Sequence, residues 1–262
     1  MSNLYMIASL LINGRRREFM NKLIHYALFH NLITVIYYGT MIAGLVGELI
    51  SATILSKKYG EKPWKALVTW LIGVPALYYW MKVQFWIESG FKTFGGYNIV
   101  RTYIWFPVVA WLFSRLLKAD PKKMCDSFGP SCVIIQAIAH WGCAFMGCCY
   151  GYPYENGIYN VALRDYRFPI QIVEAVVSLL IVVLLLNRTR LKGFVSDGTQ
   201  FPWMLILFGG TRFFLEFLRD NEKIFLGISN LAIHSLIMVV AGIIWLSRID
   251  VGKDKKSLFI KR

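Results

Sequence analysis

Apolar segments of membrane-crossing length follow one another along most of this chain, and they restrict its fold more than any other feature. A helix that spans a bilayer needs about 20 predominantly apolar residues. Seven such segments can be drawn, at Leu32–Leu55, Trp64–Ile87, Tyr97–Leu117, Cys132–Gly147, Ile170–Leu186, Pro202–Leu218 and Gly227–Leu246. Of the 262 residues, 56% are hydrophobic and 17% charged, and the mean hydropathy is +0.50. We therefore predict an all-α polytopic membrane helical bundle with about seven transmembrane helices, forming a single membrane-embedded domain over residues 1–262.

The two ends of the chain differ from the segments between them. Residues 1–30 contain a short apolar run, Leu4–Ile12, followed by the basic cluster Arg15–Arg17. A secretory signal places its basic residues before the apolar run, so this order favours an amphipathic lead-in at the membrane surface. Residues 249–262 form a basic tail.

Lysine and arginine are distributed unevenly between the two sides of the predicted bundle. The connections after the first, third and fifth segments carry, together with the tail, 17 of these residues, and the opposite side carries 10. Positive charge is usually retained on the cytoplasmic side, so we predict a cytoplasmic C-terminus and an external N-terminus. The net charge of +14 follows the loops, which indicates contact with anionic lipid and not with nucleic acid.

A stretch of small and polar residues, His140–Gly151, interrupts the fourth segment. On a helix, three of its members share one face, namely His140, Cys143 and Gly147. Glycines remove side chains from the backbone and let a ligand approach closely, here at Gly142, Gly147 and Gly151. The same small residues also suit tight helix packing, and spacing alone does not separate the two interpretations.

Charged residues inside apolar segments cost about 2.5–3.5 kcal/mol each at a helix centre, so each requires a partner or a function. The sixth segment places Arg212, Glu216 and Arg219 on one helix face. A self-neutralising Arg212–Glu216 pair that holds two helices together is one explanation. The other is an anion site, because a guanidinium binds phosphate oxygens in bidentate fashion and Arg219 would stay free to do so.

The fifth segment opens with Pro169 and carries Gln171 and Glu174 on one face. Such a pair commonly joins helices. Three separate segments thus have a polar stripe near their outer half, and we predict that the stripes line one polar cavity open to lipid headgroups. The polar connection Tyr152–Phe168 lies on the same side and is expected to cover it.

The five cysteines do not have the pattern of a disulfide framework. The spacing His-x2-Cys-x4-Cys-Cys at positions 140–149 contains soft ligands for a metal. Paired Cys-x2-Cys motifs are missing from this stretch, and on a helix Cys148 would face away from His140 and Cys143. We therefore expect no metal here.

Taken together, these motifs resemble the prolipoprotein diacylglyceryl transferase family, from about Leu32 to Leu246. The family pattern Gly-Arg-x-Gly-Asn-Phe-x-Asn-Gly-Glu…Gly is similar to residues 139–151, and His-Pro-Ser/Thr-Gln-Leu-Tyr-Glu is similar to residues 168–174. The pattern Tyr-Gly-x-x-Arg-Phe-x-x-Glu-Phe-x-Arg gives a long and specific match to residues 208–219. A Ser-Phe-His-Gly-Gly loop of the family resembles Thr93–Gly96 weakly.

The chain departs from the family patterns at several positions. His140 stands in place of an arginine, and Cys143 in place of an asparagine. Phe94 replaces a histidine, and Phe208 replaces a tyrosine. The motif residues that the chain keeps are Gly142, Gly147, Gly151, Pro169, Gln171, Glu174, Gly209, Arg212, Glu216 and Arg219.

The resemblance implies transfer of the diacylglyceryl group of phosphatidylglycerol to the lipobox cysteine of a preprolipoprotein, in the bacterial inner membrane and without a cofactor. The candidate catalytic residues are His140, Arg212 and Glu216. The candidate substrate-binding residues are Arg219, Gly142, Cys143, Gly147, Gly151, Gln171 and Glu174. The alternative is a non-catalytic or altered-acceptor relative that binds anionic phospholipid, and the phenylalanines at the histidine and tyrosine positions favour it.

This reaction needs a base that makes the thiolate and cations that hold the departing phosphate. The resemblance assigns the phosphate to Arg212 and Arg219, which Glu174 and Glu216 would orient. His140 either takes the thiol proton or replaces the lost arginine as a cation, and a histidine does the first more readily. The glycine face of the fourth segment would receive the glycerol of the lipid.

Overall fold

The computed structural model describes residues 16–94, 99–221, 223–225 and 227–249, and it describes side chains from Phe29 onward except at residues 222–226. Residues 1–15 of the predicted lead-in and residues 250–262 of the predicted tail lie outside the described residues. From Arg16 the backbone is helical and continuous with the first membrane segment. The surface position of the lead-in stays a prediction.

Each of the seven predicted apolar segments forms a helix in the described part of the chain. The helices are α2 (Arg16–Lys58), α3 (Pro63–Glu88), α4 (Ile99–Leu116), α5 (Pro121–Met146), α6 (Ile170–Leu191), α7 (Gln200–Glu216) and α8 (Asn230–Arg248). Helix α5 begins at Pro121, well before the predicted start at Cys132. The apolar pattern missed its first turns because they are polar. The Asp120 side chain caps this start by accepting a hydrogen bond from the Lys122 amide, and Pro121 suits the first helical turn.

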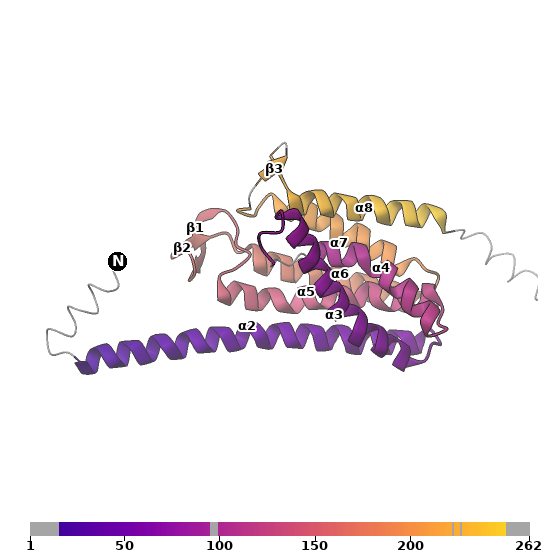
Figure 1. Ribbon diagram of the computed structural model, residues 1–262, viewed down its shortest axis with the longest axis horizontal. Coiled ribbons are helices and arrows are strands. Elements are labelled where there is room, and N and C mark those ends of the chain that lie inside the picture. Colours follow the sequence, from indigo (N-terminus) through magenta and orange to yellow (C-terminus); the bar gives the residue numbers. More distant parts are fainter. Residues whose placement is uncertain (1–15, 95–98, 222, 226, 250–262) are drawn as a thin grey trace, which may run out of the picture.

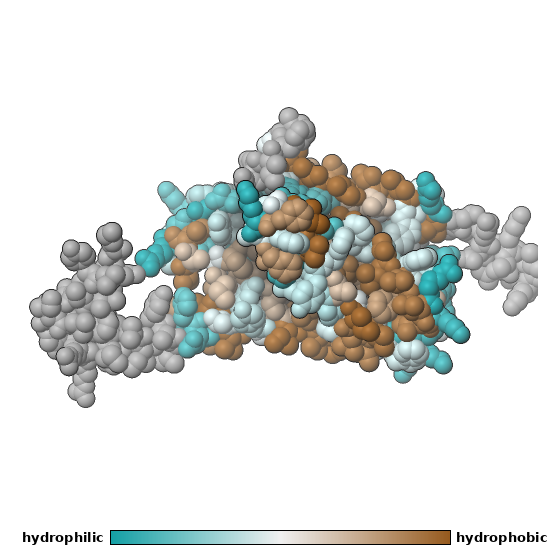
Figure 2. Space-filling view, viewed as in Figure 1, coloured by the Kyte–Doolittle hydropathy of each residue, from teal (hydrophilic) through white to brown (hydrophobic). Residues whose placement is uncertain are grey.

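The surface of the bundle is that of a membrane protein. Five of the described helices, α2, α3, α5, α6 and α8, are long and apolar enough to cross a membrane. Helices α4 and α7 have 18 and 17 residues, at the short end of the range for a span. Figure 2 shows an apolar band across the molecule with hydrophilic side chains toward both ends. The chain is therefore a multi-pass, all-α membrane protein, and this prediction is confirmed.

Helix α5 lies at the centre of the bundle, where it contacts α2, α4, α6 and α7. Helix α2 runs along one side of it (Figure 1), and two glycines allow close approach. A Cβ on Gly44 would lie 3.1 Å from the Cα of Ile135, and a Cβ on Gly142 would lie 3.0 Å from the Cα of Tyr37. Small residues permit such backbone contact between membrane helices.

A buried carboxylate on α5 fixes the start of α7. Asp126 accepts hydrogen bonds from the Ser196 hydroxyl at 2.8 Å and from the backbone amides of Gly198 and Gln200 at 2.8 and 2.9 Å. These donors lie at the N-terminal end of α7, where a negative charge is favourable. The contact sets the axial position of α7, and with it the position of Arg212 near the other end of that helix.

Two small antiparallel hairpins lie at the end of the bundle where α5 and α7 terminate (Figure 1). Their strands are β1 (Pro153–Asn160) with β2 (Asp165–Arg167), and β3 (Lys223–Phe225) with β4 (Ile228–Ser229). The first hairpin is the connection that was expected to cover the cavity. It is attached to the chain that leaves α7, since the Tyr152 amide donates to the Leu218 carbonyl at 3.1 Å.

Candidate active site

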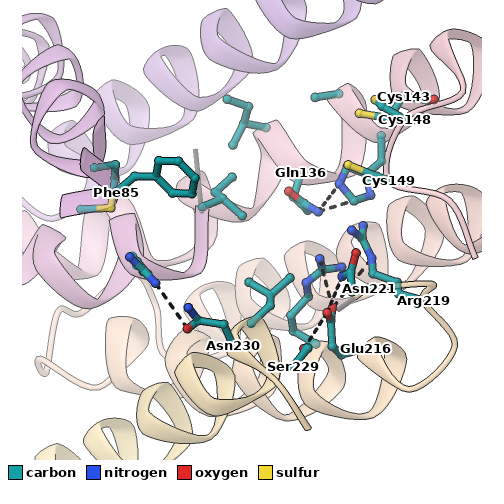
Figure 3. A pocket seen from close by; sticks show the side chains of 18 of the residues that line it. Phe85, Gln136, Cys143, Cys148, Cys149, Glu216, Arg219, Asn221, Ser229 and Asn230 are labelled. Carbon is teal, nitrogen blue, oxygen red and sulfur yellow. Dashed lines mark hydrogen bonds and ion pairs between the residues drawn. The ribbon is translucent and has the colours of Figure 1, made fainter. Parts of the chain in front are cut away.

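A cavity of about 640 Å³ lies among the helix ends on the side of the hairpins, with lining residues from α2, α3, α4, α5, α7 and α8. Charged side chains line one part of it, and three cysteines line another (Figure 3). Apolar side chains line much of the remainder, among them Tyr37, Met41, Met81, Phe85, Ile99 and Leu231. The fourth and sixth predicted segments thus meet at one cavity as expected. Gln171 and Glu174 of the fifth segment are buried and do not line it, nor does the hairpin that was expected to cover it.

Four buried side chains form what we call the charged cluster: Glu174, Arg212, Glu216 and Arg219. Arg219 donates from Nε and Nη2 to the two oxygens of Glu174 at 2.9 and 2.6 Å. Arg212 contacts Glu174 through Nη1, and its Nη2 lies 3.6 Å from Glu216. Each of the four residues is 8% exposed or less. The cluster therefore cross-links α6, α7 and the turn that follows α7.

Both arginines are paired, which corrects the expectation that Arg219 would stay free beside an Arg212–Glu216 pair. The sequence places Glu216 on the same helix as Arg212, but it does not show that Glu174 approaches from another helix. Two carboxylates now match two guanidinium groups, and buried charges require such pairing. The Arg212 Nε is buried and has no hydrogen-bond partner among the described residues.

His140 connects the charged cluster with α5. Its Nδ1 lies 2.8 Å from a carboxylate oxygen of Glu174, and its Nε2 lies 2.5 Å from the amide nitrogen of Gln136. A proton on Nδ1 satisfies both contacts, since the carboxylate accepts it and Nε2 accepts from the amide. His140 is buried and lines the cavity, so in this tautomer Nε2 is its basic atom.

The three cysteines of the cavity, Cys143, Cys148 and Cys149, form what we call the thiol cluster. Helix α5 stops at Met146, and Gly147 takes the left-handed conformation with φ +76°, as glycine commonly does after a helix. The chain turns back there, and the three sulfur atoms lie within 4.8 Å of one another. The expectation that Cys148 faces away from Cys143 is wrong, because it treated Cys148 as part of the helix.

The motif glycines pack against protein. A Cβ on Gly142 would lie 2.1 Å from the hydroxyl of Thr40 on α2. A Cβ on Gly147 would lie 2.8 Å from an atom of β1, and a Cβ on Gly151 would lie 2.6 Å from an atom of the residue after β2. This packing accounts for the three glycines, and contact of their backbone with a lipid glycerol stays a prediction.

Gln171 has a structural partner of its own. Its side-chain amide donates to the Cys148 carbonyl at 2.7 Å. It therefore holds the chain between α5 and β1, while Glu174, one turn further along α6, holds the arginines.

The family histidine and tyrosine positions lie in different surroundings. Phe208 is 2% exposed and contacts the ring of Tyr103, with centroids 5.2 Å apart. Phe94 is 59% exposed, contacts Trp86 and does not line the cavity. The rest of that weak motif, Gly95–Gly96, lies outside the described residues.

Arg101 is a cavity residue, although its position predicted a charge in an external loop. It is 7% exposed and lines the cavity. Its guanidinium donates to Glu88 at 2.7 Å and to Asn230 at 3.3 Å. Its place inside the third apolar segment was the available signal. Asn230 gave no such signal, because an asparagine at the start of a helix is also an ordinary capping residue.

Other polar residues that support the site were also missed. Glu216 accepts hydrogen bonds from the Asn221 amide at 2.5 Å and from the Ser229 hydroxyl at 2.8 Å. Gln136 holds the imidazole of His140. These uncharged residues lie at segment ends or one helical turn away from a motif, where single-sequence patterns do not distinguish them.

The fold and the cavity define an integral membrane protein with a buried polar site at one end of a helical bundle. The sequence profile of the prolipoprotein diacylglyceryl transferase family matches residues 15–248. The chain belongs to this family, and the resemblance predicted from its motifs is confirmed.

Three curated relatives carry the name phosphatidylglycerol–prolipoprotein diacylglyceryl transferase. The one from Streptococcus uberis is 24% identical over 159 residues, which cover 58% of this chain and 61% of the relative. The one from Clostridium novyi is 27% identical over 175 residues, covering 62% and 66%. The one from Streptococcus suis is 30% identical over 158 residues, covering 57% and 59%. The aligned part is less than two thirds of each of these relatives.

Proposed function

We propose that this chain transfers the diacylglyceryl group of phosphatidylglycerol to the thiol of a lipobox cysteine in a preprolipoprotein. The observation that carries the proposal is a pair of buried guanidinium groups, Arg212 and Arg219, in a cavity that also has a broad apolar lining. A phosphate ester with acyl chains matches both parts of this lining. Membership of the transferase family supports the same activity.

The phosphate is held by the two arginines of the charged cluster. Glu174 occupies Nε and Nη2 of Arg219, which orients the guanidinium and leaves Nη1 for the ligand. Arg212 also lines the cavity and adds a second buried positive charge. Glu216 restrains Arg212 from the same helix. Cations that are already in position stabilise the charge that develops on a leaving phosphate.

His140 is the base in this proposal. The acceptor thiol takes the place of the Gln136 amide at Nε2 and gives its proton to that atom, while the Nδ1 proton stays on the ring and donates its hydrogen bond to Glu174. The thiolate sulfur attacks the glyceryl carbon that carries the phosphate oxygen. A carbon–sulfur bond forms, the carbon–oxygen bond breaks, and glycerol phosphate leaves with the electron pair. The imidazolium charge arises as the phosphate gains its second negative charge.

We also propose that the cavity end of the bundle faces outward from the bacterial plasma membrane. The basic connections and Arg248 lie at the opposite end, as the positive-inside rule requires of the cytoplasmic side. Arg101 and Arg219 were counted with the external loops, but both are buried in ion pairs. The asymmetry of the loop charges is therefore larger than the sequence count gives.

The test is a mass spectrum of a lipobox peptide after incubation with phosphatidylglycerol and the purified protein. We expect a mass gain of one diacylglyceryl unit. His140→Ala should reduce the rate by about 10²- to 10⁴-fold, the usual contribution of a general base. The matched control is His234→Ala, because His234 is a half-buried histidine of α8 that does not line the cavity.

Two results would overturn the proposal. One is an unmodified peptide with wild-type protein that is folded and binds phosphatidylglycerol, which would support a lipid-binding relative instead. The other is equal activity of the His140 and His234 variants, which would remove the imidazole from the mechanism.

A further inference from the structure

The proposed transfer reaction assigns no function to the thiol cluster. All five cysteines of the chain lie among the described residues, and each is a free thiol. Cys143 is buried, Cys148 is half-buried and Cys149 is exposed to the cavity, yet their sulfur atoms all lie within 4.8 Å of one another. Packing alone gives no reason to gather three soft nucleophiles at one point.

The backbone that gathers these sulfurs is held in place from outside. The Asn160 side chain of β1 donates to the Gly147 carbonyl at 3.0 Å, and Gln171 of α6 donates to the Cys148 carbonyl at 2.7 Å. Cys149 itself has φ +57°, a left-handed conformation that is uncommon for a residue with a side chain. Strained conformations of this kind persist where the surroundings impose them, and they concentrate at functional sites.

We propose that Cys143, Cys148 and Cys149 bind a thiophilic divalent cation, Zn²⁺ by preference, through three thiolate ligands. Zinc–sulfur bonds of about 2.3 Å at tetrahedral angles place the sulfurs about 3.8 Å apart, so small side-chain rotations close the site. Zinc has no preference for a particular geometry from its d electrons and is commonly bound by thiolates. Three protein ligands leave the fourth position to a water or a substrate atom, and here that position adjoins the cavity.

The charges around the cluster suit such a site. Three thiolates and one Zn²⁺ carry a net charge of minus one. Figure 3 shows Cys149 between the other two cysteines and Arg219, so the cation of the Arg219–Glu174 pair lies on the side of the cluster that faces the cavity. His140 already contacts Glu174 and Gln136 and is not needed as a ligand. The metal site thus stands on the cysteines alone, whether or not the chain transfers lipid.

The experiment uses the full chain, purified in detergent without a polyhistidine tag and kept reduced. Titration with Co²⁺ should give a sulfur-to-cobalt charge-transfer band that saturates near one equivalent, and Zn²⁺ should abolish it. Elemental analysis after Zn²⁺ loading and buffer exchange should give the same stoichiometry. Cys148→Ala and Cys149→Ala should each lower Zn²⁺ affinity at least 100-fold, and Zn²⁺ should no longer raise their unfolding temperature.

The matched control is Cys125→Ala, which removes a buried thiol of α5 that does not line the cavity and should leave metal uptake unchanged. Cys148→Ala and Cys149→Ala change the turn after α5 and leave the buried face of that helix intact. A loss of folding in either variant would appear as a lower unfolding temperature without metal, and is thus measured separately from the loss of metal binding. The proposal is overturned if reduced wild type shows no charge-transfer band. Metal uptake by the triple variant C143A/C148A/C149A equal to that of wild type would also overturn it. So would a disulfide among these cysteines if the protein takes up no metal once that disulfide is reduced.

Discussion

The charged cluster takes its side chains from α6, from α7 and from the turn after α7, whereas the thiol cluster comes from the single stretch Cys143–Cys149. The first is held by ion pairs between elements far apart in the sequence, such as Arg219 with Glu174. The second is formed by one reversal of the chain after Met146, to which Asn160 and Gln171 each add one hydrogen bond from outside. The charged cluster therefore depends on how the helices pack, and the thiol cluster depends on the local conformation of a turn.

The two clusters also differ in their relation to the family. Glu174, Arg212, Glu216 and Arg219 all match the family motifs, while Cys143 stands where the motif has an asparagine. The arginines that are proposed to bind the lipid phosphate are thus among the residues that this chain shares with the motifs. Cys143 is where the thiol side of the cavity departs from the motif, and substitutions on each side should separate the two contributions.

Glu174→Gln should have the largest effect of any single substitution. Glu174 pairs with both arginines and with His140 at 2% exposure, so the amide leaves buried positive charge without its partner. Loss of one partner of a buried ion pair costs about 3–5 kcal/mol. We expect a lower unfolding temperature in detergent and loss of peptide lipidation, with metal uptake by the thiol cluster retained in the folded fraction.

The control for that substitution is Asp220→Asn. Asp220 pairs with Arg167 beside the cavity, but its side chain is 50% exposed. An exposed pair of this kind contributes less than about 1 kcal/mol, so the control should unfold close to wild type. Equal losses for the two variants would show that the Glu174 pairs are no stronger than surface pairs.

Gly147→Ala should disturb the thiol cluster next most strongly. The position has φ +76°, and a Cβ there would lie 2.8 Å from the Asn160 side-chain oxygen. A left-handed conformation costs a residue with a side chain about 1–2 kcal/mol, and overpacking adds about 1–3 kcal/mol. We expect a lower unfolding temperature and weaker Zn²⁺ binding by the turn.

Gly193→Ala separates the two costs. Gly193 has φ +63°, but nothing lies within 4 Å of the Cβ that alanine would add. It should lose only the conformational part, about 1–2 kcal/mol, and bind Zn²⁺ like wild type. If Gly147→Ala binds Zn²⁺ as tightly as Gly193→Ala does, the turn does not determine the position of the cysteines.

Much of the fold was predictable because apolar periodicity and length are local properties. Hydropathy located each of the helices that the structure describes, but it missed the polar first turns of α5, where the signals were Asp120 and Pro121. Arg212 on α7 and Arg219 in the turn after it were found because charge in or beside an apolar segment is conspicuous. Their pairing with Glu174 was not found, because no single-helix pattern records which helices touch.

The position of the thiol cluster was not predicted from the sequence either, but for the opposite reason. Its residues are close in sequence, and the error lay in extending the helix beyond Met146. Glycine at position 147 was the signal for a helix end, since glycine is favoured just after the last helical residue. It was instead interpreted as a small residue on a helix face. With the helix ended there, the three cysteines no longer follow helical spacing.

Gly209→Ala should have the smallest of these effects and should act on the charged cluster. A Cβ on Gly209 would lie 2.9 Å from the Ser235 carbonyl oxygen on α8, so alanine pushes α7 away from α8. Overpacking of this kind costs about 1–3 kcal/mol. Because Arg212 lies one turn further along α7, we expect peptide lipidation to fall while Co²⁺ uptake by the thiol cluster is unchanged.

The adjacent residue is the control, since nothing lies within 4 Å of a Cβ on Gly210. Gly210→Ala should be neutral or stabilise the helix by up to about 1 kcal/mol, because alanine is the better helix former. Equal lipidation by the two variants would show that contact between α7 and α8 does not position the arginines. A parallel loss of lipidation and Co²⁺ uptake in Gly209→Ala would show that the two clusters depend on the same packing, which contradicts the separation of long-range and local control.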